Sequence, residues 1–380
     1  MLVCDNITSS THALANRSAA FAALSRFVTY PFRSIRHARL HDDVLCAAIR
    51  ALVDRLTIAQ SRYLIPTTTE QYLAFCNKHG LRPSILQTKG PHGEIPAHWI
   101  GSPDADTLIV YFHGGGYTQP ATAGCFIYLE RLVRDINSDK TCRSVAVLMP
   151  AYTLAPEATH PTQLSQGATV LSHLIHDCSR PPSSIFLFGD SSGGNLLLSI
   201  LSHALHPHPQ VPALSLEQPL GGMLLLSPWT SFHTDYPSFE ANKTLDILTP
   251  LALRRWSAMF LGTTGPAVPE SGPRPIYGDT WTEASLNAAS WWHGSHNVVS
   301  DIFVWSGGFE VFRDPIRELK QHLTTGWVDG GADPDRLVFV ETAQEAHIQP
   351  IIDAVHANTN STKGDAQVAI EAWVKARLQV

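Results

Sequence analysis

The sequence has no surplus of basic residues and no basic stripe. Its 380 residues include 27 lysines and arginines against 33 aspartates and glutamates, which gives a formal net charge of −6. A nucleic-acid-binding surface needs clustered positive charge, so nucleic acid is not an expected partner. No apolar run approaches the ~20 residues that cross a bilayer, so no stable membrane span is predicted.

Paired cysteines are also lacking. The six cysteines are scattered along the chain and form no Cys-x-x-Cys motif. This favours free thiols in a reducing compartment over a disulfide framework or a zinc site. The N-terminus has no basic region followed by an apolar run, so we predict no signal peptide and a cytoplasmic location.

Histidine is abundant, with 19 residues, but its spacing does not predict a metal site. The closest groupings lie in segments 206–209 and 293–296. Neither has an acidic residue or a third histidine at ligand spacing. We therefore expect no metal and no cofactor.

Six short apolar runs, each bounded by turn residues, predict buried parallel strands. Segments with helical periodicity lie between and after them, and this alternation predicts an α/β fold with a doubly wound, mostly parallel sheet. The expected strands are 107–112, 144–150, 184–189, 222–227, 301–307 and 335–341, and the expected helices are 162–178, 195–205, 315–323 and 366–378.

Two further segments complete the predicted organisation. Residues 1–85 form an N-terminal helical segment that contributes to a cap, and 231–300 form a cap or lid inserted between two parts of the core, 86–230 and 301–380. The insertion is rich in proline, glycine and aromatic residues, so extra packing around the core is the alternative. The apolar run at 21–32 could lie on a membrane surface, but we expect it to pack into the core.

The stretch Gly-Asp-Ser-Ser-Gly-Gly at 189–194 contains two adjacent candidate nucleophiles. A serine on a sharp strand-to-helix turn needs glycine two residues before and two after it, because side chains there collide. Only Ser191 has glycine at both offsets, so it is the predicted nucleophile. The extra serine and the α/β surroundings exclude a trypsin-like protease.

Three successive glycines, Gly114 to Gly116, follow the expected strand at 107–112. Their backbone N–H groups can approach a ligand oxygen closely, as the oxyanion of an acyl-transfer reaction requires. We assign the oxyanion hole to the N–H groups of Gly115, Gly116 and Ser192, the residue after the nucleophile. A phosphate loop is the alternative, but no lysine follows at the required position.

His-Gly-Gly-Gly-Tyr at 113–117 together with Gly-Asp-Ser-x-Gly-Gly resembles the hormone-sensitive-lipase family of α/β hydrolases. The stretches 152–164 and 224–229 are similar to that family as well, and 90–120 and 291–312 are similar to its fungal members, which include steryl acetyl hydrolases. The resemblance covers roughly residues 105–350 and implies the α/β-hydrolase fold with a helical cap. Ser192 departs from the pattern, since the family usually has alanine there.

The resemblance also implies the rest of a catalytic triad in the chain order serine, acid, histidine. Glu310 stands where the family has its first carboxylate, with Asp314 as the alternative acid. His347 follows the last expected strand and completes the order. The predicted catalytic residues are therefore Ser191, Glu310 and His347.

These residues predict a serine carboxylester hydrolase that forms an acyl-enzyme on a small or medium hydrophobic ester. An acetyl ester of a sterol or fungal secondary metabolite is the substrate that the resemblance implies. Acyl transfer or cyclisation from the same acyl-enzyme and non-catalytic binding of a hydrophobic ligand are the alternatives, and a homodimer is one possible assembly. The expected substrate-binding residues are Tyr117, Trp229, Tyr236 and Phe239.

Overall fold

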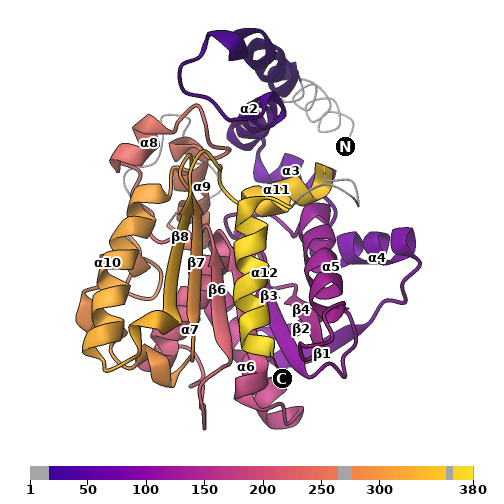
Figure 1. Cartoon of the computed structure of the whole chain (residues 1–380), viewed down its shortest axis with the longest axis vertical. Coiled ribbons are helices and arrows are strands. Elements are labelled where there is room, and N and C mark those ends of the chain that lie inside the picture. Colours follow the sequence, from indigo (N-terminus) through magenta and orange to yellow (C-terminus); the bar gives the residue numbers. More distant parts are fainter. Residues whose placement is uncertain (1–16, 264–275, 357–362, 380) are drawn as a thin grey trace.

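A single eight-stranded sheet forms the centre of the computed structural model, which describes residues 17–263, 276–356 and 363–379 (Figure 1). The strand order is β1-β2-β4-β3-β5-β6-β7-β8, and only the pairings of β1 with β2 and of β2 with β4 are antiparallel. The strands are β1 (Ile85–Gly90), β2 (Gly93–Ile100), β3 (Thr107–Phe112), β4 (Val145–Pro150), β5 (Ile185–Asp190), β6 (Gly222–Leu226), β7 (Ile302–Gly307) and β8 (Leu337–Thr342).

Helices cover both faces of this sheet, because successive residues of its central strands point to opposite faces and both sets of residues are apolar. In β3, Leu108 and Val110 pack into one core, while Ile109 and Tyr111 pack into the other. Helices α6 (Thr162–Ser172), α7 (Ser192–Leu205) and α10 (Arg313–Asp329) cover the first face, and α5 (Ala123–Asn137) and α12 (Asp365–Leu378) cover the second (Figure 1). This confirms the predicted α/β fold and all six expected strands.

The antiparallel hairpin β1–β2 was not predicted. Its strands pair from Ile85 with His98 to Gly90 with Gly93, at one edge of the sheet. The first strand reads Ile-Leu-Gln-Thr-Lys-Gly and buries one residue fully, Thr88. A half-exposed edge strand does not need a continuous apolar run, so it left no clear signal in the sequence.

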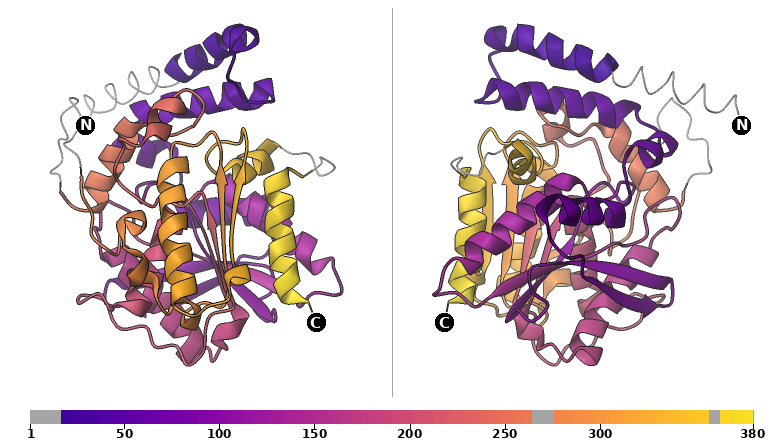
Figure 2. Two further views of the ribbon diagram at one scale, coloured as in Figure 1. Left: turned by 60° about the vertical axis from the view of Figure 1, so that its left-hand side comes forward. Right: turned by 90° about the vertical axis from the view of Figure 1, so that its right-hand side faces the viewer.

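The N-terminal segment lies across the end of the sheet where β5 leads into α7 (Figures 1 and 2). It contains a helix at 17–29, followed by α2 (Leu40–Arg55) and α3 (Ile58–Leu64), whereas the next helix, α4 (Thr68–His79), packs beside α5 and β2 (Figure 1). Helix α2 packs against α9 (Pro250–Phe260), which comes from the insertion. Two segments far apart in the sequence therefore meet above the strand ends.

The insertion has two parts with different positions. Its first part carries α8 (Pro237–Ala241) and α9 near the strand ends. Its last part, from about residue 280 to 300, forms short 3₁₀ turns that pack on the flank of the sheet against α7 and α10. The expectation that the whole of 231–300 covers the strand ends is therefore wrong for this second part, whose tryptophans extend the core instead.

The apolar side chains of the N-terminal helix do not enter the core. Phe21, Leu24, Phe27 and Val28 are 58–75% exposed, and Phe32 after the helix is 87% exposed. The expectation that this run packs into the core is wrong, because the helix touches the body of the protein through its other face, where Arg26 is buried beside Asp43. Among the described helices, none is both long and apolar enough to cross a bilayer.

Candidate active site

Ser191 lies on the sharp turn between β5 and α7, with φ of 52° and ψ of −117°. The turn leaves no room for side chains at the flanking glycines. A Cβ atom on Gly189 would lie 2.6 Å from the carbonyl of Gly193, and one on Gly193 would lie 1.9 Å from the carbonyl oxygen of Phe112. The steric requirement that selected Ser191 over Ser192 is therefore present in the fold.

Ser192 points away from this turn and is fully buried. Its hydroxyl oxygen accepts the backbone N–H of Tyr117 at 3.2 Å. The side chain thus fixes the end of the glycine loop against the start of α7. Ser191, in contrast, lines a cavity together with His347.

Glu310 and His347 meet in the loops that follow β7 and β8. Nδ1 of His347 lies 3.0 Å from Oε2 of Glu310, and both residues are buried. The other oxygen of Glu310 accepts hydrogen bonds from the hydroxyl of Ser227, at 3.1 Å, and from the N–H of Gly307. The three donors around the carboxylate stabilise its ionised form, so Glu310 can orient the imidazole.

Burial shifts the pKa values of this pair in opposite senses. Burial raises the pKa of Glu310, against the hydrogen bonds from Gly307 and Ser227 that favour its ionised form. Burial also lowers the pKa of His347 from its usual value, against the nearby charges of Asp246 and Asp190. A histidine with a lowered pKa stays neutral, and able to accept a proton, further into the acidic range.

Asp314, the alternative acid, lies elsewhere. Its carboxylate accepts the backbone N–H of Ser238 at 2.8 Å and pairs with Arg313 at 3.0 Å. It therefore fixes α8 and the start of α10, while Glu310 is the carboxylate brought to His347.

Asp246 was missed by sequence reasoning. This buried residue of the insertion accepts the backbone N–H groups of Val311 at 2.6 Å and of His347 at 3.3 Å. It thereby joins the Glu310 loop to the His347 loop. Burial raises its pKa to about 6, against the lowering effect of His347. Nothing in the sequence near Asp246 marks it, because its partners are backbone groups far away in the chain.

The glycine loop at 113–117 is held against the nucleophile turn by Asp190. The carboxylate of Asp190 accepts the N–H of Gly114 at 2.8 Å and the hydroxyl of Tyr111. Gly115 and Gly116 have φ of 110° and 59°, and a Cβ on Gly116 would lie 2.3 Å from the ring of Trp256. Within the described residues, neither of these two N–H groups donates to a protein acceptor, so both remain available to a ligand oxygen.

The cavity beside Ser191 has a volume of about 440 Å³. One wall is the glycine loop, and the others are mostly aliphatic. Of the described residues that line it, only Asp190 and His347 carry ionisable groups other than a thiol, and both are already hydrogen-bonded within the site. The apolar wall includes Leu45, Ile49, Leu52, Val53, Leu56 and Ile65 from the N-terminal segment, Ile247, Leu248 and Trp256 from the insertion, and Ile348, Ile351, Ile352 and Val355 from the last part of the core.

The four aromatic residues predicted to bind substrate lie outside this lining. Tyr117 is fully buried, where it donates to Oδ1 of Asn195 at 2.6 Å and stacks on Phe260. Trp229 is buried against Phe232 and Phe312. The prediction is therefore wrong for these two residues, because their rings fill the core beneath the site.

The other two residues lie beneath the cap. Phe239 is 4% exposed and packs near Phe312, while the hydroxyl of Tyr236 donates to Glu318 at 2.5 Å. Both fix α8 to α10 and do not contact the cavity. Aliphatic residues of α2 line the cavity in their place.

A protein-family model described as the alpha/beta hydrolase fold matches residues 109–330, which is more than half of the chain. The hormone-sensitive lipase of Mus musculus is 24% identical over 263 residues, covering 66% of this chain and 31% of that protein. Steryl acetyl hydrolase 1 of Saccharomyces cerevisiae is 25% identical over 188 residues, covering 47% and 40%. An acetyl-hydrolase of Streptomyces hygroscopicus is 25% identical over 232 residues, covering 60% and 66%.

Among solved structures, the fold is similar to an esterase from the bacterial hormone-sensitive lipase family, with a TM-score of 0.62 and 20% identity over 90% of this chain and 99% of the other. It is also similar to carboxyl esterase 2 of the fungus Tuber melanosporum, with a TM-score of 0.60 and 18% identity over 78% and 88%. The chain spans from about a fifth to two thirds of the length of the curated relatives it matches.

Labelling with an organophosphonate should distinguish the two serines. Ser191→Ala should abolish labelling, since the only hydroxyl on the strained turn is lost. Ser192→Ala should still be labelled, because its N–H is unchanged, but it should melt at a lower temperature, since leaving the Tyr117 N–H without an acceptor costs about 1–3 kcal/mol. A peptide map that places the adduct on Ser192 would overturn the assignment.

The pH dependence of this labelling should report on Asp246. Asp246→Asn removes a negative charge that raises the pKa of His347. Neutral His347 should therefore persist to lower pH, and the acid limb of the pH–rate profile should move to lower pH. The maximal rate should fall by about tenfold, or ~1.4 kcal/mol in the barrier, because the amide has one acceptor oxygen for the N–H groups of Val311 and His347. Asp314→Asn is the matched control and should leave the limb in place. An acid limb that moves to higher pH in Asp246→Asn would contradict the role of Asp246 in raising the pKa of His347.

Proposed function

Because the chain belongs to the hormone-sensitive-lipase family of α/β hydrolases, we propose that it is a serine carboxylester hydrolase that acts through an acyl-enzyme. The observation that carries the proposal is the convergence of four groups on one cavity: Ser191 on its strained turn, the His347–Glu310 pair, and the glycine loop with unpaired N–H groups. The cytoplasmic location stays a prediction.

In the proposed reaction, Oγ of Ser191 attacks the ester carbonyl carbon while His347 accepts the hydroxyl proton. Glu310 holds the proton on Nδ1 of His347, so that Nε2 is the accepting nitrogen. The N–H groups of Gly115, Gly116 and Ser192 stabilise the oxyanion of the tetrahedral intermediate. His347 then donates its proton to the departing alcohol, and the acyl group remains on Ser191.

Water completes the cycle. His347 removes a proton from a water molecule, which attacks the acyl carbon and releases the carboxylic acid from Ser191. No metal or cofactor takes part in these steps.

The substrate that the cavity favours is an ester with a hydrophobic group of small or medium size. A volume of about 440 Å³ lies within the usual range of small-molecule pockets, and its aliphatic walls offer few polar partners. Since two of the relatives are named acetyl hydrolases, we propose an acetyl ester whose alcohol part is hydrophobic, such as a sterol or a secondary metabolite. A screen of p-nitrophenyl esters by chain length, together with such acetates, tests this proposal.

The triad assignment predicts distinct kinetics for the two candidate acids. Glu310→Ala should lower kcat by ~10⁴-fold with a smaller effect on KM, because His347 loses its orienting partner. Asp314→Ala should keep kcat within a few-fold of the parent and mainly lower the melting temperature, since it loses contacts to Ser238 and Arg313. Steady-state kinetics on p-nitrophenyl acetate measures both. The opposite ranking would assign the role to Asp314.

Chain-length preference should be set by α2. Val53→Ala and Leu52→Ala enlarge the cavity, so they should shift the preference toward longer acyl chains by roughly 10- to 200-fold in the kcat/KM ratio, the range expected for one methylene. Phe239→Leu, which lies outside the lining, is the matched control. A shift in the control together with an unchanged profile in both α2 variants would place the ester elsewhere. Incorporation of labelled water into the acid product separates hydrolysis from acyl transfer.

A further inference from the structure

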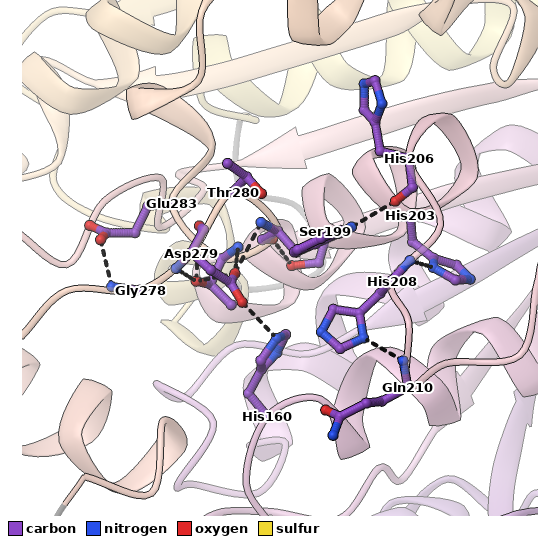
Figure 3. A network of polar contacts seen from close by, with 12 residues as sticks. His160, Ser199, His203, His206, His208, Gln210, Gly278, Asp279, Thr280 and Glu283 are labelled. Carbon is purple, nitrogen blue, oxygen red and sulfur yellow. Dashed lines mark hydrogen bonds and ion pairs between the residues drawn. The ribbon is translucent and has the colours of Figure 1, made fainter.

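Three metal-binding side chains from distant loops meet on the flank of the protein, outside the lining of the substrate cavity. His160 follows β4, His208 follows α7, and Asp279 precedes the 3₁₀ turn at Ala284–Leu286. One ligand atom from each of them lies within 4.8 Å of the others. Figure 3 shows the imidazole of His160 and the carboxylate of Asp279 directed toward one another, with His208 beside them.

One separation within the cluster matches that of two ligands around one small cation. Nε2 of His160 lies 3.4 Å from Oδ2 of Asp279. Two ligands placed ~2.1 Å from a zinc ion at a tetrahedral angle are about that far apart. Two imidazole nitrogens and one carboxylate oxygen are also a donor set that zinc accepts, with water as the fourth ligand.

A buried nitrogen of the cluster lacks a hydrogen bond, which points to a missing ligand. The His160 side chain is 9% exposed, and its Nε2 forms no hydrogen bond to any described residue. An ordinary histidine–aspartate pair in the same chain looks different: Nδ1 of His173 is hydrogen-bonded to Asp177 at 2.7 Å, near the surface. The longer contact of His160 leaves space that a cation between the two groups would use.

The surroundings already orient Asp279 for this role. Its Oδ1 accepts the N–H groups of Trp281 and Thr282, both at 3.0 Å, and the hydroxyl of Thr282 at 2.9 Å. Oδ2 is thereby directed at His160. Hydrogen bonds to one oxygen of a ligating carboxylate are the usual support of a metal site.

The rings of both histidines are also held in place. His208 packs against Trp281 with centroids 4.7 Å apart, and His160 packs against Phe260 at 5.6 Å. Nδ1 of His208 accepts the N–H of Gln210 at 3.2 Å, which places the ring proton on Nε2, the nitrogen that would bind the metal ion. Binding there moves the ring proton to Nδ1, so this long contact is the interaction that the ion replaces.

From this geometry we propose that His160, His208 and Asp279 form a zinc site that fastens the end of the insertion to the α/β core. Two hydrogen bonds connect the turn that carries Asp279 to the glycine loop. The side-chain amide of Asn195 donates to the backbone carbonyl of Thr282 at 2.7 Å, and its Oδ1 accepts a hydrogen bond from the hydroxyl of Tyr117 at 2.6 Å. A metal ion at this position therefore stabilises the wall behind the candidate active site without contacting the substrate. The inference does not depend on the proposed reaction.

Cobalt and zinc titrations of the full chain test the site after treatment with a chelator. The parent should bind one equivalent of Co²⁺ with the visible absorption of a four-coordinate ion, and Zn²⁺ should displace it. Its melting temperature should rise with the concentration of free Zn²⁺. His208→Gln and Asp279→Asn should each weaken Co²⁺ binding by roughly 100-fold, whereas His173→Gln, the matched control, should bind as the parent does.

Two results would overturn the proposal. One is the absence of stoichiometric Co²⁺ binding by the parent, which would leave an ordinary ion pair between His160 and Asp279. The other is equal binding by the parent and by His208→Gln, which would place the metal on other residues. If the variants do not fold, X-ray absorption of the zinc-loaded parent decides: nitrogen and oxygen neighbours at ~2.0–2.2 Å support the site, and a sulfur neighbour at ~2.3 Å contradicts it.

Discussion

The close approach between the nucleophile turn and the end of β3 is the constraint on which the site depends. The backbone of Gly193 lies so near the carbonyl oxygen of Phe112 that a Cβ atom would sit 1.9 Å from it. Asp190 then binds the N–H of Gly114, so the strained turn and the glycine loop form one rigid unit. This unit fixes Ser191 before any ligand arrives, and preorganised donors are worth more in a buried site than in water.

The cap depends on a second set of contacts, which join segments far apart in the sequence. Arg50 of α2 donates to the backbone carbonyl of Asp246 in the insertion, and the Asp246 carboxylate accepts N–H groups from the loops of Glu310 and His347. The helix that shapes the cavity and the pair that activates the serine are therefore connected through one residue. A change in the insertion can consequently alter both the pocket wall and the pKa of His347.

Features with a local cause could be predicted from the sequence. The five inner parallel strands are buried on both faces and left continuous apolar runs, and the half-buried edge strand β8 left one as well. The glycines that identify Ser191 are required by its own turn. Features that depend on distant partners could not be predicted. The β1–β2 hairpin lies at an edge, Asp246 binds backbone groups, and the cavity is lined by α2 because of where that helix docks.

The four misassigned aromatic residues show why composition misleads about pockets in such a fold. A large ring buries more apolar surface than any aliphatic side chain, so rings are used where the core must be filled, as Trp229 and Tyr117 do here. A cavity needs side chains that leave space and still exclude water. The leucine, isoleucine and valine side chains of α2 meet that need on one face of the helix, while its other side chains hold it to the insertion. The same helix thus provides both the closure of the site and its selectivity, so a catalytic unit that the sequence motifs identify is combined with a pocket that those motifs do not describe.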